Sequence, residues 1–232
     1  MAKTPAQIMD ILKRGDVFKQ LSDTPLAIEV ANRAIHLFWT TYPWRDTLAE
    51  LPPFYPIPGE ADHVTPDIQI PSNFWALDVV MLKQINGDEY DLRISNKLPR
   101  ASYEDWPTAI AYVPEIAGFR LHPLPNAGMS APWCQIEGTY KKKPPTVTDD
   151  NFDTDALPLD EMYQDVYEQA VRYKYFETLG DSRAGEVAYV RGIPQYTGQL
   201  GRYMAAVQTA IGRENLHRGK EIDAPAEGLA LG

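Results

Sequence analysis

The chain has 232 residues, 44% of them hydrophobic, which is enough for one large domain or two small ones with a buried core. Its formal net charge of -10 argues against a sequence-reading DNA-binding protein, but an acidic wall suits a channel through which DNA slides without sticking. The single cysteine, Cys134, excludes an intrachain disulfide and a thiolate-rich metal site. The sequence has no apolar run long enough to span a membrane and no N-terminal stretch like a signal peptide. We therefore expect a protein that is made in a cytosol and has no membrane partner.

Two helices are expected at the start of the chain. Thr4 and Gln7 predict a capping box for a first helix, which should end at Gly15. Thr24-Pro25 predicts the start of a second helix, which should end near Tyr42. This second helix is apolar over more than half of its circumference, so it should lie between neighbours. Its second apolar face carries Ile28, Ala31, Ile35 and Trp39.

Between Trp44 and Pro145 the apolar residues recur with a period of two, which predicts β-strands. Asn86-Gly87 predicts a hairpin with a type I′ turn, because this pair tolerates positive φ angles. The candidate strands are bounded by proline or glycine, and a small β-sandwich is the expected closure. Trp75, Leu77, Val79, Met81 and Ile85 line one face before the turn, Tyr90, Leu92 and Ile94 alternate after it, and further strands are expected at 54–57, 109–113, 119–122 and 133–140.

Helical spacing returns after the polar stretch 146–155, in a helix that should end at Gly180. Asp181-Ser182 is expected to cap a following helix that runs through Val190 and is interrupted near Pro194. Residues 200–211 should again be helical.

The fold class expected is α+β, with N- and C-terminal helices forming one helical bundle around a central antiparallel β-sandwich-like insertion. Residues 1–45 and 155–211 are assigned to the helical bundle, and 46–154 to the β-rich insertion. Residues 212–232 have no sustained period, so we expect an extended C-terminal tail that lies against a partner.

The sequence contains no catalytic motif, so no catalytic residue, cofactor or metal ligand is assigned. Cys134 is expected to be a buried apolar residue beside Trp133. The lysines at 141–143 are interpreted as solvated residues that protect a strand edge, with a partner contact as the minority alternative. Four histidines stand alone in the sequence: His36, His63, His122 and His217.

The order of these features resembles phage head-to-tail adaptor proteins of the tail tubular protein A type, over most of the chain. A helical pair leads into Tyr42-Pro43-Trp44-Arg45, and a strand-rich insertion ends in a segment like 119–125. A strand similar to 136–140, a basic and proline-rich stretch at 141–145 and the Leu157-Pro158 entry into the last helices follow. The chain departs from the pattern in the prolyl run 51–58 and in Pro194.

The resemblance implies a structural virion protein at the head-tail junction, made in the cytoplasm of the infected bacterium, and not an enzyme. About twelve copies would form a homo-oligomeric ring under the portal protein and bind a downstream nozzle or stopper protein of the tail. Double-stranded DNA would pass through the channel without specific binding during ejection. Contacts with the portal are expected from Leu216, Ile222, Leu229 and Leu231, and contacts between subunits from Ile28, Ile35, Trp39, Tyr167 and Tyr175.

Two other classes of protein stay open. A monomeric β-sandwich module that binds carbohydrate could use Trp75, Trp106 and Trp133 as platforms, although three tryptophans can as easily belong to a core. An enzyme could use Glu137 with an aspartate of a neighbouring strand as an acid pair. The oligomeric state separates the adaptor from the monomeric module.

Overall fold

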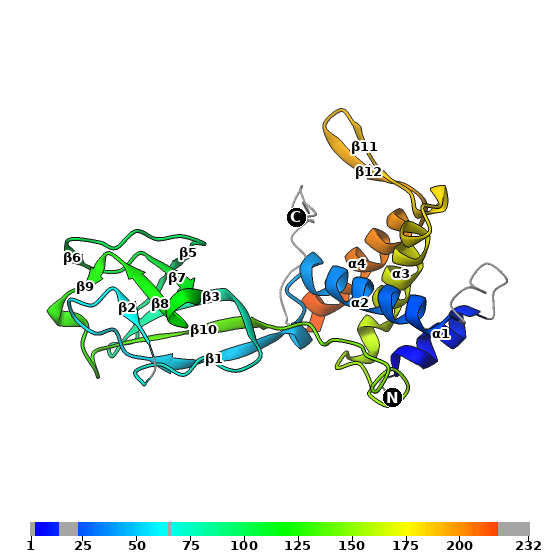
Figure 1. The fold of residues 1–232 in the computed structure, drawn as a ribbon. Coiled ribbons are helices and arrows are strands. Elements are labelled where there is room, and N and C mark those ends of the chain that lie inside the picture. Colours follow the sequence, from blue (N-terminus) through cyan, green and yellow to red (C-terminus); the bar gives the residue numbers. More distant parts are fainter. Residues whose placement is uncertain (1–2, 14–22, 65, 218–232) are drawn as a thin grey trace. The chain divides into compact units, whose positions relative to one another are not determined.

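The computed structural model describes residues 3–13, 23–64 and 66–217. It divides into a helical unit, Met1–Tyr42 with Pro144–Gly232, and a β unit, Pro43–Lys143 (Figure 1). Helices and antiparallel sheets occupy separate stretches of the chain, which confirms the α+β class. The β unit is inserted between two parts of the helical unit, and its first and last strands pair with each other from Leu48 and Lys141 onward. Paired ends allow a domain to be inserted without separating the flanking chain.

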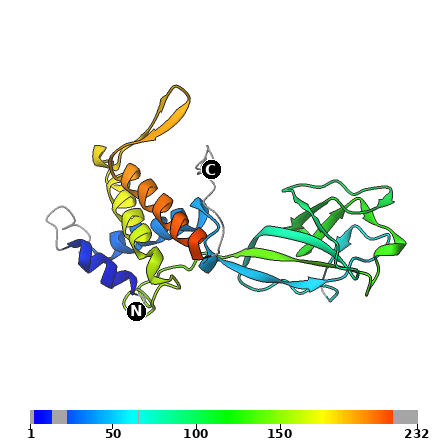
Figure 2. The ribbon, with the colours of Figure 1, turned by 180° about the vertical axis from the view of Figure 1, so that it is seen from behind.

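The helical unit contains α1 (Pro5–Lys13), α2 (Thr24–Thr41), α3 (Glu161–Thr178) and α4 (Gly198–His217). The capping box of α1 is confirmed: Thr4 N donates to Gln7 Oε1 at 3.0 Å, and Gln7 N donates to Thr4 Oγ1 at 3.2 Å. α3 packs against both α2 and α4, and it lies beside α4 in both views (Figure 2).

Tyrosines join the three long helices through their hydroxyl groups. Tyr203 on α4 shares a 2.7 Å hydrogen bond with Thr41 on α2, and Tyr163 on α3 donates to Glu214 on α4 at 3.0 Å. All three aromatic and acidic side chains are at most 2% exposed. A buried hydroxyl or carboxylate is costly unless it is hydrogen-bonded, so these contacts stabilise one arrangement of the bundle.

Two expectations for the helical unit are corrected. α4 continues to His217, six residues into the segment 212–232 that was expected to be extended, and Glu214 belongs to the helical core. The helix expected after Asp181-Ser182 is instead a short 3-10 turn, η5 (Ser182–Ala184), followed by a hairpin of β11 (Val187–Val190) and β12 (Ile193–Tyr196). The spacing of Val187 and Val190 is compatible with a helix, but the segment 187–190 is rich in β-branched and aromatic residues, which favour a strand.

The β unit is a sandwich of two four-stranded sheets. One sheet has the order β1-β10-β3-β4 and is antiparallel, and the other has the order β2-β8-β7-β5 with β5 parallel to β7. One apolar core takes residues from both sheets, including Phe74 and Ile136 from the first and Phe119 from the second. The strands are β1 (Leu48–Phe54), β2 (Asp62–His63), β3 (Phe74–Gln84), β4 (Glu89–Asp91), β5 (Arg93–Ile94), β6 (Glu104–Asp105), β7 (Ala109–Val113), β8 (Gly118–His122), β9 (Leu124–Pro125) and β10 (Cys134–Lys142), with 3-10 turns η2 (Arg45–Thr47), η3 (Pro114–Ile116) and η4 (Ala127–Met129).

The β3–β4 hairpin is confirmed, but its turn is not of type I′. Gly87 has a φ of 92°, whereas Asn86 is outside the positive region that a type I′ turn requires. Gly87 N donates to Gln84 O, and Gln84 N donates to Asp88 O. These bonds enclose a three-residue loop that ends on a left-handed glycine, the next commonest hairpin geometry.

The chain after this turn changes sheets at Leu92. β4 pairs with β3 in the first sheet, whereas β5 pairs with β7 in the second, and Leu92 between them is 5% exposed and donates its N–H to Val80 O at 2.9 Å. The single alternating strand expected at Tyr90, Leu92 and Ile94 is therefore split in two. This crossing helps to join the two layers of the sandwich.

Two further expectations change with the sheet order. The strand expected at 54–57 is β1, Leu48–Phe54, and its two prolines fit an edge strand, where a missing N–H removes no ladder bond. Lys141 and Lys142 do not protect an edge, because β10 is paired on both sides, with β1 and β3. Burial lowers the pKa of Lys141.

Candidate interaction surfaces

The structure places most of the expected subunit contacts inside the helical unit. Ile35, Trp39, Tyr167 and Tyr175 are at most 2% exposed, and Tyr167 donates its hydroxyl hydrogen to Ala31 O at 3.4 Å. Their own chain already encloses these four side chains, so they have no surface to offer a neighbouring copy in this conformation. Ile28 is half-buried and stays a predicted contact.

The second apolar face of α2 accounts for this outcome. Sequence spacing shows that a face is apolar, but it does not show which neighbour covers it. Here α3 packs against α2, with the Phe38 and Tyr163 rings 6.0 Å apart in an edge contact. Of the expected portal contacts, Leu216 lies in α4, and Ile222, Leu229 and Leu231 lie outside the described residues.

The most exposed apolar element of the helical unit is the β11–β12 hairpin, which extends beyond the ends of α3 and α4 (Figures 1 and 2). Tyr189 is 73% exposed, and the neighbouring pair Val190 and Ile193 are 57% and 58% exposed. In a two-stranded ribbon successive side chains point to opposite faces, so Tyr189 lies on one face and the Val190–Ile193 pair on the other. The hairpin is therefore apolar on both faces.

The turn and base of this hairpin are well defined. Arg191 and Gly192 have φ angles of 54° and 81°, the positive pair that a two-residue type I′ turn requires. At the base, Glu186 N donates to Thr197 Oγ1 and Thr197 N donates to Glu186 O, both at 3.0 Å. A Cβ at Gly185 would overlap the carbonyl oxygen of Thr197, so only glycine permits this close approach. The hairpin is thus closed at both ends.

Sequence reasoning missed this surface, although a signal for it exists. Val187 to Val190 is rich in β-branched and aromatic residues, and Arg191-Gly192 stands between two such runs of four residues. Glycine in the second turn position is typical of a hairpin. The interruption noted near Pro194 is the returning strand.

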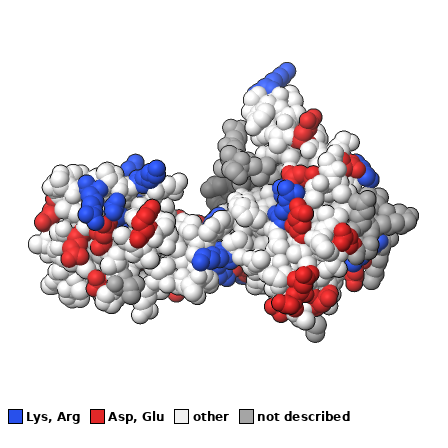
Figure 3. Space-filling view, viewed as in Figure 1, with Lys and Arg blue, Asp and Glu red and all other residues white. Residues whose placement is uncertain are grey.

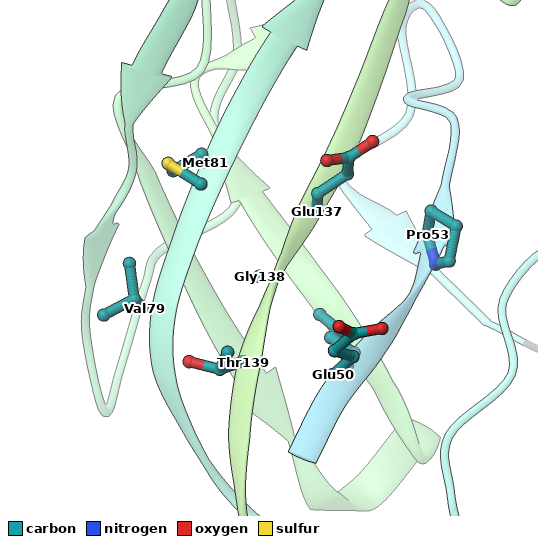
Figure 4. A pocket seen from close by; sticks show the side chains of 8 residues that line it. Glu50, Pro53, Val79, Met81, Glu137, Gly138 and Thr139 are labelled. Atoms are coloured by element: carbon teal, nitrogen blue, oxygen red, sulfur yellow. The ribbon is translucent and has the colours of Figure 1, made fainter. Parts of the chain in front are cut away.

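A second exposed surface lies on the outer face of the β1-β10-β3 sheet (Figure 4). The residues expected to line one face of β3 are divided between its two faces. The register with β10 shifts between Val79 and Leu77, so Leu77 packs against the core with Val80 and Leu82, whereas Val79 on the outer face is 49% exposed. A shallow hollow of about 420 Å³ occupies this face. It is lined by Glu50, Leu51, Pro53, Val79, Met81, Glu137, Gly138 and Thr139.

This face does not form the acid pair considered for Glu137. Glu137 lies 3.7 Å from Lys83 Nζ, and the aspartate of the neighbouring strand, Asp78, accepts a hydrogen bond from Thr139 at 3.0 Å. Glu50 and Glu137 line the same open hollow (Figure 4).

The three tryptophans proposed as platforms are all exposed, but they do not form one surface. Trp75 and Trp133 lie at opposite ends of the β3–β10 ladder, because Phe74 pairs with Lys142 and Gln84 with Cys134. Trp106 lies 6.1 Å from the Tyr90 ring, and both line a separate hollow of about 420 Å³. This hollow thus combines a tryptophan with a second aromatic ring.

Several titratable groups of the β unit have structural roles. Arg120 and Arg100 both donate to Asp62, and the hydrogen bond from Arg120 holds the pKa of Asp62 below its usual range. Burial lowers the pKa of His63, whose Nε2 accepts a 2.9 Å hydrogen bond from Ile57 N. Cys134 is buried as expected.

Within 3–13, 23–64 and 66–217, no group of three or more histidine, cysteine or acidic side chains could hold a metal ion. In that same part of the chain, no helix combines the length and apolar character needed to cross a membrane.

Comparison with known families identifies one match. The model of a family described as SU10 adaptor protein matches residues 23–224, which include the whole β unit and the helices α2, α3 and α4. A search of curated proteins found no match.

Proposed function

The chain belongs to the SU10 adaptor protein family, a family of phage structural adaptors, and we propose that it joins the capsid of a tailed phage to its tail. In this role it is a virion component without catalytic activity. The observation that carries the proposal is the family match over 23–224, because it includes the three long helices α2, α3 and α4 and the whole inserted β unit. The resemblance to the tail tubular protein A type supports the finer proposal of a ring of about twelve copies beneath the portal protein.

The charge and surface of the chain are consistent with this role. Acidic residues outnumber basic ones by 32 to 22, which disfavours retention of DNA by a channel wall. A ring is closed by a heterologous interface, in which each copy offers two different surfaces. The exposed outer sheet face and the exposed hairpin are candidates for contacts with copies, portal or a downstream nozzle or stopper protein.

Native mass spectrometry of the purified chain mixed with the portal ring of the same phage tests the proposal. We expect about twelve copies to bind one portal ring, as the resemblance implies. The control is the portal ring of an unrelated phage, which should bind none. A chain that stays monomeric and indifferent to its own portal would overturn the adaptor proposal.

Portal binding through the C-terminal segment is tested by truncation. Removing 212–232 would delete Glu214, which accepts the hydrogen bond of Tyr163 inside the helical unit, so the cut should follow His217. We expect a chain ending at His217 to keep its thermal stability and lose portal binding, as the proposed contacts Ile222, Leu229 and Leu231 imply. A triple change of these three residues to serine in the full-length chain is the matched variant, and normal portal binding by both variants would exclude this contact.

The hollow beside Trp106 favours carbohydrate binding as a second candidate function. Aromatic rings that face a cavity are suited to stack against sugars, and Tyr90 and Trp106 both line this hollow. Titration of the chain with an oligosaccharide array, with Trp106→Ala as the variant and Trp133→Ala as the control, tests it. Binding that Trp133→Ala keeps and Trp106→Ala loses would support this candidate.

A further inference from the structure

We propose that the β11–β12 hairpin is an arm that packs against a neighbouring copy of this chain. The inference deepens the proposed function, on which it rests, by naming the element that joins copies of the adaptor. The arm is Val187–Tyr196, with Tyr189 on one face and the Val190–Ile193 pair on the other.

The exposure of the arm is the first argument. An isolated two-stranded hairpin is at best marginally stable in water, and it needs a further surface to cover its apolar side chains. Tyr189, Val190 and Ile193 are each more than half exposed. Both faces of the ribbon are apolar, a pattern typical of strands that are covered on both sides.

The preformed geometry of the arm is the second argument. Its type I′ turn and its hydrogen-bonded base hold the two strands together before any partner binds. A preformed binding element loses less conformational entropy on association than a disordered one. Pro194 lacks an N–H group, so β12 is poorly suited to being extended by another strand, and the side-chain faces are the surfaces left for docking.

Charge identifies a second copy as the occupant. Between Val187 and Tyr196 the only charged residue is Arg191, at the turn, and the hairpin surface is white along its length with blue at its tip (Figure 3). The helical unit carries 19 acidic against 13 basic residues, and the β unit 13 against 9, so each unit of a second copy has a net negative charge that attracts this cation. A nucleic acid would need more than one cation on the arm.

The arm also supplies the asymmetry that a ring requires. A heterologous interface joins two different surfaces, so that every copy gives one and receives the other. A projecting apolar arm on one side and an acidic body on the other satisfy this condition. The expected interface has Tyr189, Val190 and Ile193 as its apolar anchors and Arg191 in an ion pair at its margin.

Cross-linking in assembled particles tests the arm directly. Tyr189→Cys places a thiol at a site that is 73% exposed, whereas the native Cys134 is buried, so a photoreactive maleimide attaches selectively at 189. In particles that contain this variant, we expect cross-links between position 189 and a second copy of the chain, identified by mass spectrometry of the linked peptides. The inference would be overturned if position 189 formed cross-links only to a different protein, or formed none. The proposed function would still stand in that case, because it requires only that the chain is present in the particle.

A matched set of variants measures what the arm contributes. Changing Tyr189, Val190 and Ile193 together to serine should weaken association of copies by roughly tenfold or more, because truncation of buried interface anchors commonly has this effect. Ile85→Ser, at the tip of the β3–β4 hairpin and 63% exposed, is the control and should leave association unchanged. If the wild-type chain is missing from the particle, the proposed function fails. The arm is then tested separately, by comparing the dissociation constants for self-association of the purified wild-type chain and the triple variant. Equal dissociation of the wild type and the triple variant would overturn it.

Discussion

The β3–β4 and β11–β12 hairpins have similar tight turns but opposite relations to a core. β3–β4 closes through Gly87, and Leu82 at its centre is 1% exposed in the core of the sandwich. β11–β12 closes through Arg191-Gly192, and all four residues of β11 are exposed. Turn chemistry alone can therefore specify a hairpin, whereas its contribution to the stability of the free chain depends on what covers it.

The largest expected difference between the hairpins comes from side-chain truncation. Leu82→Ala should lower the free energy of unfolding by about 2–5 kcal/mol, because it leaves a cavity in a packed core. Val190→Ala, at a 57% exposed site, should change it by less than about 0.5 kcal/mol. Urea denaturation of the two purified variants measures both values, and similar losses would mean that β11–β12 is covered within its own chain.

The turn glycines provide a second, smaller contrast. Neither Gly87 nor Gly192 has an atom within 4 Å of an added Cβ, so alanine at either site is opposed only by the positive φ. Gly87→Ala should cost about 1–2 kcal/mol of global stability, since a left-handed residue with a Cβ is strained by this amount. Gly192→Ala should leave global unfolding unchanged and alter only the hairpin, as circular dichroism melts of the pair would reveal.

The β unit is expected to contribute a pH dependence of stability near neutral pH, whereas the β11–β12 hairpin, 187–196, contains no acidic residue or histidine. Burial lowers the pKa of His63, so protonation near its ordinary pKa of about 6.5 favours the unfolded chain, and stability should fall as the pH drops below this value. NMR titration should show that the His63 ring is still neutral at the pH where an ordinary histidine is half protonated, because its Nε2 accepts the hydrogen bond from Ile57 N. A ring that titrates at or above the ordinary value would contradict this prediction.

The smallest effect is expected at the base of β11–β12. Thr197→Val removes the hydroxyl that accepts from Glu186 N, at a net cost of about 0.5–1.5 kcal/mol to the local hairpin. Amide hydrogen exchange of 187–196 should become faster, while the midpoint of thermal unfolding stays the same. Thr209→Val, at an exposed position of α4, is the control. If Thr197→Val lowered the midpoint of thermal unfolding and Thr209→Val did not, the hairpin would be shown to stabilise the bundle.

Local chemistry in the sequence determined several elements directly. Four of these elements depend on residues close in sequence: the Thr4–Gln7 capping box, the end of α2 before Pro43, the end of α3 before Gly180 and the hairpin at Gly87. The α+β class followed from the change between periods of 3.6 and two. The ordered features of the family pattern then indicated a phage adaptor, which the family match supports.

Only the tertiary structure decided which apolar faces are covered. The spacing of four apolar and aromatic residues is compatible with either a core position or a subunit contact, and the packing of α2, α3 and α4 places them in the core. These residues are Ile35, Trp39, Tyr167 and Tyr175. The strand that changes sheets at Leu92 and the central position of β10 likewise depend on partners far away in sequence. A periodic pattern records that a face is apolar, but burial is a property of two surfaces in contact, and the second surface is chosen by the fold.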